Sequence, residues 1–101
     1  SALQYADDKL KNNMEVVSIA VYGGVMALQF AGPGISRTTP EWRALVLFAV
    51  VKYGTALKWA GDELQDDYDL VLAAVWNDGD ALQFASERLQ NDPVMMLVAR
   101  Q

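Results

Sequence analysis

Residues 81–85 read Ala-Leu-Gln-Phe-Ala, and three variants of this pentapeptide precede them in the chain. The variants are Ala-Leu-Gln-Tyr-Ala at 2–6, Ala-Leu-Gln-Phe-Ala at 27–31 and Ala-Leu-Lys-Trp-Ala at 56–60. Because the four copies start at residues 2, 27, 56 and 81, the intervals between them are 25, 29 and 25 residues. A recurring period of this length is typical of repeat proteins. We therefore divide the chain into unit 1 (2–26), unit 2 (27–55), unit 3 (56–80) and unit 4 (81–101).

The spacing of apolar residues within a unit predicts two short helices. In unit 3, Leu57, Ala60 and Leu64 recur at i, i+3 and i+7, as on one face of an amphipathic helix. A second apolar stripe, at positions 70, 71, 74 and 75, follows the pair Asp66-Asp67, which we interpret as a break and a helix N-cap. The predicted caps are Thr55 and Asp80 for the first helices of units 3 and 4, and Asn13, Asp67 and Asp92 for the second helices of units 1, 3 and 4.

Unit 2 departs from this plan in its middle. Gly32-Pro33-Gly34 should end its first helix near Ala31, because glycine costs about 1 kcal/mol and proline about 3 kcal/mol inside a helix. The unit also has four more residues than its neighbours. Since Thr39-Pro40 is a typical N-cap and first helical residue, we place the extra residues as one added turn at the start of a helix from Pro40 to about Lys52.

Helices this short are marginal in isolation, so the stability must come from packing between units. We predict one all-α domain over residues 1–101, a short α-solenoid-like stack of four antiparallel helix pairs. We expect the chain to be an excerpt of a longer repeat protein. The aromatic residues of the four pentapeptides share one repeat position and are predicted to pack in the core; they are Tyr5, Phe30, Trp59 and Phe84.

One pattern describes a unit as a whole. It consists of Ala-Leu-x-aromatic-Ala, a leucine, an Asn/Asp pair and a Val/Leu-rich helix that ends in Asn-x-Gly, and it is clearest from Ala56 to Leu97. Residues Ala2 to Val21 follow it nearly as well, whereas the middle of unit 2 does not. This pattern resembles the tandem repeat family called domain of unknown function 4116 (DUF4116). The resemblance implies a helical repeat that occurs in multi-copy arrays, and it transfers no catalytic residue, because the family has no established ones.

The residue types of the chain argue against most kinds of chemistry. There is no His and no Cys, which removes the usual zinc ligands, the commonest general base and the thiol nucleophile. The segment 77–80 lacks the glutamate that a calcium loop places six residues after its glycine, where this chain has Ala85. We therefore expect no catalytic site, no metal and no cofactor. The catalytic alternative is an enzyme that uses carboxylates alone, such as Asp66, Asp67 and Asp69. We instead interpret these acids as helix caps and solvated side chains.

The net charge of −5 argues against nucleic acid and anionic membranes as partners, since both attract a positive protein surface. No apolar run approaches the roughly 18 residues that a membrane span needs, and no signal peptide is visible. Together with the absence of Cys, this favours an intracellular location.

Charge is concentrated in unit 3. That unit has seven acidic residues against one lysine, a net charge of −6, whereas unit 2 has a net charge of +2 and unit 4 is neutral. We expect a protein partner with a basic surface. Trp42 with Arg43, in the added turn of unit 2, is a further candidate because both residue types are enriched at interface hot spots; a core position for Trp42 beside Leu45 is the alternative. The candidate partner contacts are Trp42, Arg43, Asp62, Glu63, Asp66 and Asp69.

These patterns favour a non-catalytic protein-interaction module. The first alternative is a structural array that associates with itself, because Met95-Met96-Leu97-Val98 lies near the C-terminus, where an uncapped stack would expose apolar surface. The second alternative is an accessory repeat domain attached to a catalytic domain of a longer protein.

Overall fold

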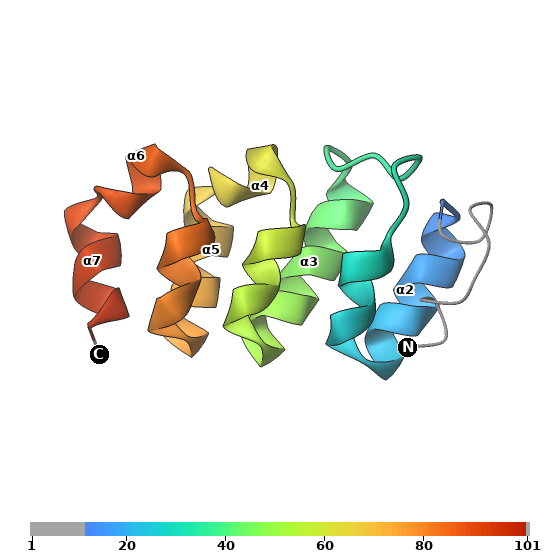
Figure 1. The fold of residues 1–101 in the computed structure, drawn as a ribbon, viewed down its shortest axis with the longest axis horizontal. Helices are drawn as coiled ribbons and strands as arrows, with labels where there is room; N and C mark the ends of the chain where they lie inside the picture. The colour runs from blue at the N-terminus through green and yellow to red at the C-terminus, as the bar shows by residue number, and fades with distance from the viewer. Residues whose placement is uncertain (1–11, 101) are drawn as a thin grey trace.

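The computed structural model describes residues 12–100, and the regular structure in that range is entirely helical. This confirms the predicted all-α class. The structure measures 42 × 21 × 18 Å, and its helices follow one another along the long axis (Figure 1). In chain order they are α2 (Met14–Gly23), the 3₁₀ helix η2 (Val25–Phe30), α3 (Pro40–Lys52), the 3₁₀ helix η3 (Gly54–Trp59), α4 (Asp62–Gln65), α5 (Tyr68–Asn77), the 3₁₀ helix η4 (Gly79–Phe84), α6 (Glu87–Gln90) and α7 (Pro93–Ala99).

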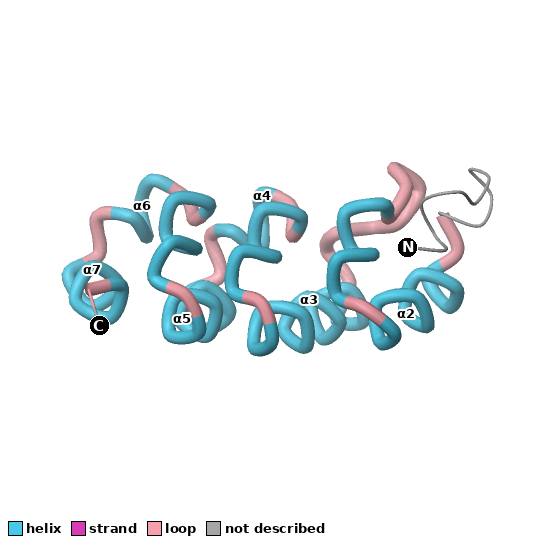
Figure 2. The backbone as a smooth tube through the Cα atoms, turned by 60° about the horizontal axis from the view of Figure 1, so that its bottom comes forward, coloured by secondary structure: helices cyan, strands magenta, loops and turns pink. Residues whose placement is uncertain are grey.

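The helices form two rows and an edge. The longer helices α2, α3, α5 and α7 lie in one row, which we call the α-row, and the 3₁₀ helices η2, η3 and η4 lie in the other (Figure 2). The short helices α4 and α6 lie along one edge, at the top of Figure 1. Units 2, 3 and 4 therefore each contribute one helix to each row.

The prediction of two helices per unit is wrong for units 3 and 4, which contain three each. Their first segment is a six-residue 3₁₀ helix, and a separate four-residue α-helix follows it. In unit 3 the chain turns between them at Gly61, whose φ of 94° lies in the left-handed region that favours glycine. The predicted first stripe is thus distributed over two helices, although Leu57, Ala60 and Leu64 are all buried.

The caps predicted for the first helices are also wrong. Helix η3 begins at Gly54, so Thr55 lies inside it, and the buried Thr55 hydroxyl has no hydrogen-bond partner. Helix η4 is capped by Asp78, whose carboxylate accepts a hydrogen bond of 3.0 Å from the backbone N–H of Asp80. In both units the helix begins two residues earlier than the apolar stripe suggests.

The caps predicted for the α-row are confirmed. Asn13, Thr39, Asp67 and Asp92 each accept a hydrogen bond of 2.9 to 3.2 Å from a backbone N–H in the first turn of the helix that follows. These side chains satisfy N–H groups that have no partner within the helix, which fixes where each helix starts. The helix predicted from Pro40 to about Lys52 is α3, with 13 residues against 10 in α5, so the added turn lies where expected.

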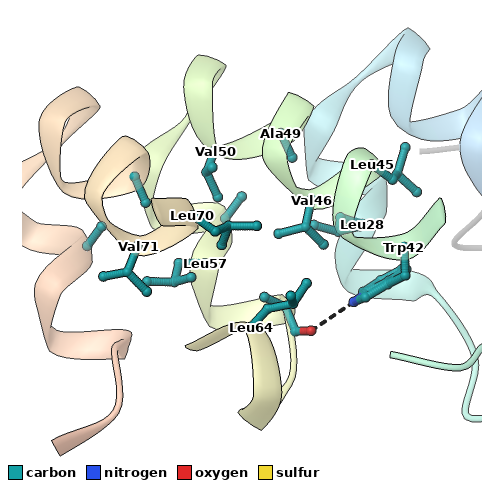
Figure 3. Packing of buried hydrophobic residues seen from close by; sticks show 14 of the residues in the cluster. Leu28, Trp42, Leu45, Val46, Ala49, Val50, Leu57, Leu64, Leu70 and Val71 are labelled. Carbon is teal, nitrogen blue, oxygen red and sulfur yellow. Dashed lines mark hydrogen bonds between the residues drawn. The ribbon is translucent and has the colours of Figure 1, made fainter. Parts of the chain in front are cut away.

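The buried core repeats with the units. Val17, Val46 and Val71 hold the same position in units 1, 2 and 3, and each is 0% exposed. The same position in unit 4 is Met96, at the end of the row, and it is 38% exposed. The predicted stripe at positions 70, 71, 74 and 75 is buried throughout. Figure 3 shows the apolar side chains that fill the space between neighbouring units, among them Val46, Val50, Leu57, Leu70 and Val71.

The aromatic residues of the pentapeptides pack at the margin of this core. Phe30, Trp59 and Phe84 contact it but are only partly buried. The ammonium group of Lys58 lies 4.9 Å from the ring centre of Trp59 and 5.9 Å from that of Phe84. Tyr5, the fourth member of this set, lies outside the described residues.

Unit 2 has a loop at 31–39 where units 3 and 4 have α4 and α6, and Arg37 holds this loop together. Its guanidinium donates hydrogen bonds of 2.6 to 3.0 Å to three backbone carbonyls of the loop. The same group lies 4.6 Å from the ring centre of Trp42, within cation–π range. Partial burial lowers the pKa of Arg37. The Arg37 side chain of this loop therefore lies over the Trp42 ring.

Candidate functional site

Helix α5 has a second stripe of residues, next to the buried stripe at positions 70, 71, 74 and 75. Asp69, Leu72, Ala73 and Trp76 recur at i, i+3, i+4 and i+7, which places them on one helix face. Together with α7 this face forms a groove of about 500 Å³, which we call the α5–α7 groove. Its lining is Val51, Asp69, Leu72, Ala73, Trp76, Asn77, Val94 and Val98.

Trp76 is the most prominent side chain of the groove. It is 73% exposed, more than any other large apolar residue in the described part of the chain. A second hollow of about 350 Å³, bounded also by Asp78 and Gly79, shares Trp76, Asn77 and Val98 with the groove. The two hollows therefore adjoin, and we call them together the trough, which is apolar along the groove and more polar at the C-terminal end of α5.

Asn77 ties this end of the trough to the preceding unit. Its side-chain oxygen accepts a hydrogen bond of 2.7 Å from the backbone N–H of Gly54, and its side-chain nitrogen donates one of 3.2 Å to the carbonyl of Val51. The end of α5 is thus bound to the end of α3. These bonds hold Val51 and Trp76 in place as walls of the trough.

A carboxylate stands at each end of the trough. Asp69 lies in the first turn of α5 and is exposed, and Asp78 follows its last residue. Neither hollow has a lysine or an arginine among its lining residues. The pKa of Arg43 is raised first by its hydrogen bonds to Asp67 and only last by the charge of Asp69. The trough therefore combines an apolar groove with a carboxylate at each end.

Trp42 is a core residue, so the prediction that it contacts a partner is wrong. Its side chain is 0% exposed, and it belongs to the same buried cluster as Leu45, which confirms the alternative position. Its indole Nε1–H donates a hydrogen bond of 2.8 Å to the carbonyl of Ala60, drawn as a dashed line in Figure 3. The added turn of α3 brings Trp42 against unit 3, where its ring fills space between the units.

Arg43 joins units 2 and 3. Its Nε lies 2.8 Å from Oδ2 of Asp67, and a terminal nitrogen donates to Oδ1 at 3.2 Å, so the guanidinium grips the carboxylate with two parallel bonds. Hydrogen bonding to Asp67 raises the pKa of Arg43, and the same bond lowers the pKa of Asp67. Both groups are engaged within the protein.

Asp66 joins units 3 and 4 in a similar way. Its Oδ1 accepts hydrogen bonds from the Ser86 hydroxyl at 2.6 Å and from Nε of Arg88 at 3.0 Å. The hydrogen bond from Ser86 lowers the pKa of Asp66 most, and the hydrogen bond from Arg88 lowers it further. Of the predicted acidic contacts, Asp62, Glu63 and Asp69 remain exposed without an ion pair to another described residue.

The sequence from α3 to α6 also matches a known family. Residues 43–90 match the family described as Domain of unknown function (DUF4116). The resemblance predicted from Ala56 to Leu97 is thereby confirmed over most of its length. The matched segment includes all of α5, one wall of the groove, and ends before α7. No curated protein and no solved structure matches the chain.

The sequence patterns predict only Asp69 among the residues that line the groove. Leu72 and Ala73 extend the buried stripe of α5, so their spacing indicates a helix that is apolar on several sides rather than a binding face. Val94 and Val98 lie four residues apart on α7, which is a signal too short to separate from core packing. The exposed position shared by Tyr22, Val51 and Trp76 is visible in the aligned units, and it was the usable clue.

The described residues contain no group of side chains that could hold a metal ion. Within residues 12–100, no three carboxylates are arranged to hold a metal ion. Asp66 and Asp67, although adjacent, bind different arginines, Arg88 and Arg43. None of the helices in this range has the length and hydropathy that a membrane span requires.

Proposed function

We propose that the chain is a non-catalytic protein-interaction module, built as a short α-solenoid-like stack of four repeat units. The equal burial of Val17, Val46 and Val71 in successive units supports the stacked arrangement. A sequence without His or Cys supports binding rather than catalysis.

The observation that carries the proposal is the exposed apolar surface of the α-row. Tyr22, Val51 and Trp76 hold one repeat position on α2, α3 and α5, and they are 60%, 51% and 73% exposed. Exposed apolar surface of this kind marks interaction sites on soluble proteins, and tryptophan is among the residues that dominate binding energy at interfaces. The α-row is therefore the surface on which we place a partner protein.

The charge of unit 3 supports a partner with a basic surface. Asp62 and Glu63 lie in the first turn of α4, and Asp69 lies in the first turn of α5. Because all three are exposed, each adds only a modest, salt-screened attraction to a bound partner. Their combined effect is expected mainly in the rate of association and in the choice of partner.

Reversal of Asp62, Glu63 and Asp69 to lysine is expected to reduce the partner recovered by affinity capture by about tenfold or more, because three attractions become three repulsions. The variant spares Asp66 and Asp67, whose bonds join the units. The measurement is quantitative capture from a cell extract at two salt concentrations, with the loss larger at the lower one.

A matched control reverses Glu15, Glu41 and Glu87 to lysine. These residues are also exposed and lie in the first turns of α2, α3 and α6. The net-charge change is therefore the same, and each reversal again places a cation near a helix N-terminus. The control should keep the partner. Equal recovery with both variants, or equal loss, would contradict a specific role for unit 3.

Self-association is a second candidate function, favoured by exposed apolar residues of α7. Met96 and Leu97 are 38% and 60% exposed, whereas the position of Met96 is fully buried in the other three units. A second copy of the chain could cover these residues as one unit covers the next. Light scattering that finds only monomer at high concentration would exclude this candidate.

A further inference from the structure

The trough along α5 has the dimensions and charge pattern of a receptor for a helix. Asp69 lines the groove at the first turn of α5, and Asp78, the residue after α5, lines the adjoining hollow. Their separation of nine residues corresponds to about 13 Å along the axis of an α-helix. Between them lie the apolar side chains of Leu72, Ala73 and Trp76. A ligand that fits this pattern has an apolar centre and a cation on each side.

We propose that the trough, which consists of the α5–α7 groove and the adjoining hollow, binds an amphipathic helix of a partner protein, of the pattern cation-x-x-apolar-apolar-x-x-cation. This proposal rests on the proposed function and names the chemistry of its partner. Two cations seven residues apart on a helix are about 10 Å apart along its axis, and the length of lysine or arginine side chains makes up the difference to the carboxylates. The two apolar residues between them face the groove on the same side of the helix.

The walls of the groove suit such a ligand. Leu72 and Ala73 of α5 and Val94 and Val98 of α7 are apolar, and a helix laid between two parallel neighbours packs its side chains into the space between theirs. Trp76 adds a large flat surface that an apolar or a cationic side chain can cover. A volume of about 500 Å³ is sufficient for a few side chains rather than for a whole domain.

The carboxylates at the two ends of the trough favour a ligand with positive charge. Asp69 and Asp78 make no ion pair with another described residue. One oxygen of Asp78 accepts the N–H of Asp80, and a carboxylate has further lone pairs for a cation. An acidic helix or an anionic lipid surface would meet repulsion at both ends, as would a second copy of this chain with its net charge of −5.

The test uses a synthetic, end-capped helical peptide of about 15 residues, with the sequence Lys-x-x-Leu-Leu-x-x-Lys at its centre and alanine elsewhere. Its matched control replaces both lysines by glutamate. Each peptide is titrated into the full 101-residue chain while the indole N–H signals of its three tryptophans are followed by NMR. The lysine peptide should shift the Trp76 signal and leave that of the buried Trp42 unchanged.

Variants of the chain localise the site. Trp76→Ala should weaken binding of the lysine peptide about tenfold or more. Because Trp76 is exposed, this variant should keep its fold, and an unchanged circular dichroism spectrum verifies that. The pair Asp69→Asn and Asp78→Asn should weaken binding severalfold and remove most of the salt dependence; asparagine at 78 still serves as an N-cap. The control pair Asp62→Asn and Glu63→Gln, outside the groove, should leave the affinity within about twofold.

Three results would overturn the proposal: no binding of the lysine peptide, equal affinity for the glutamate peptide, or binding that leaves the Trp76 signal in place. If the peptide instead shifts the backbone signals of Asp62 and Glu63, the groove assignment fails while an acidic interaction surface remains. If the peptide occupies the groove but reversal of the unit 3 acids does not affect partner capture, the groove assignment stands and the wider role of unit 3 fails.

Discussion

Replacement of Trp42 by alanine is expected to lower the free energy of unfolding by about 3–5 kcal/mol. The ring is 0% exposed, Arg37 covers it from the loop of unit 2, and its N–H bonds the carbonyl of Ala60 in unit 3. Its removal opens a cavity where two units meet. Since domains of this size are stable by only about 5–15 kcal/mol, the loss should be measurable by urea denaturation followed by circular dichroism.

Trp42→Phe separates packing from hydrogen bonding. It retains most of the ring but removes the donor, which leaves the carbonyl of the buried Ala60 without this partner. We expect a smaller loss of about 1–3 kcal/mol. A loss below about 1 kcal/mol for Trp42→Ala would be incompatible with a buried ring at this junction.

Gly54→Ala is expected to cost about 3 kcal/mol or more, because a Cβ at this position would overlap the backbone carbonyl oxygen of Ala74. The obstacle is backbone rather than a flexible side chain, so η3 or α5 would have to move. Such a movement would also disturb the hydrogen bond from the Gly54 N–H to Asn77. Thermal unfolding monitored by circular dichroism measures the effect.

Gly79→Ala should show a similar loss, because a Cβ there would overlap the carbonyl oxygen of Ala99, 25 residues after Ala74. The control is Gly23→Ala, whose added Cβ meets nothing within 4 Å at the end of α2. That substitution should leave stability unchanged or raise it slightly, as alanine favours helices. Equal behaviour of Gly23→Ala and Gly54→Ala would argue against close contact between the 3₁₀ helices and the α-row.

The sequence predicts correctly those features that depend on neighbouring residues. The start of α3 at Pro40 follows from Thr39-Pro40, and the N-caps of α5 and α7 follow from an aspartate before an apolar stripe. These signals act within one turn of the chain. They need no knowledge of what packs against the helix.

The sequence does not predict features that depend on contacts between units. Leu57 and Leu64 are buried although the chain breaks at Gly61 and η3 is a 3₁₀ helix. The apolar pattern therefore does not distinguish one continuous helix from two separate ones. Trp42 has no counterpart in the other units, so its repeat position carried no information about burial. The groove appears only when α7 is placed beside α5, because its walls belong to different units.

The central claim is that units of similar sequence are stacked so that equivalent positions are buried alike. Because the chain has no Cys, single cysteines introduced at Val46, Val71, Val51 and Trp76 can report burial through their rate of thiol alkylation. We predict that Val46→Cys and Val71→Cys react about 100-fold or more slowly than Val51→Cys and Trp76→Cys in the folded protein, and at equal rates in denaturant. Similar rates at all four positions in the folded protein would contradict the stacked arrangement.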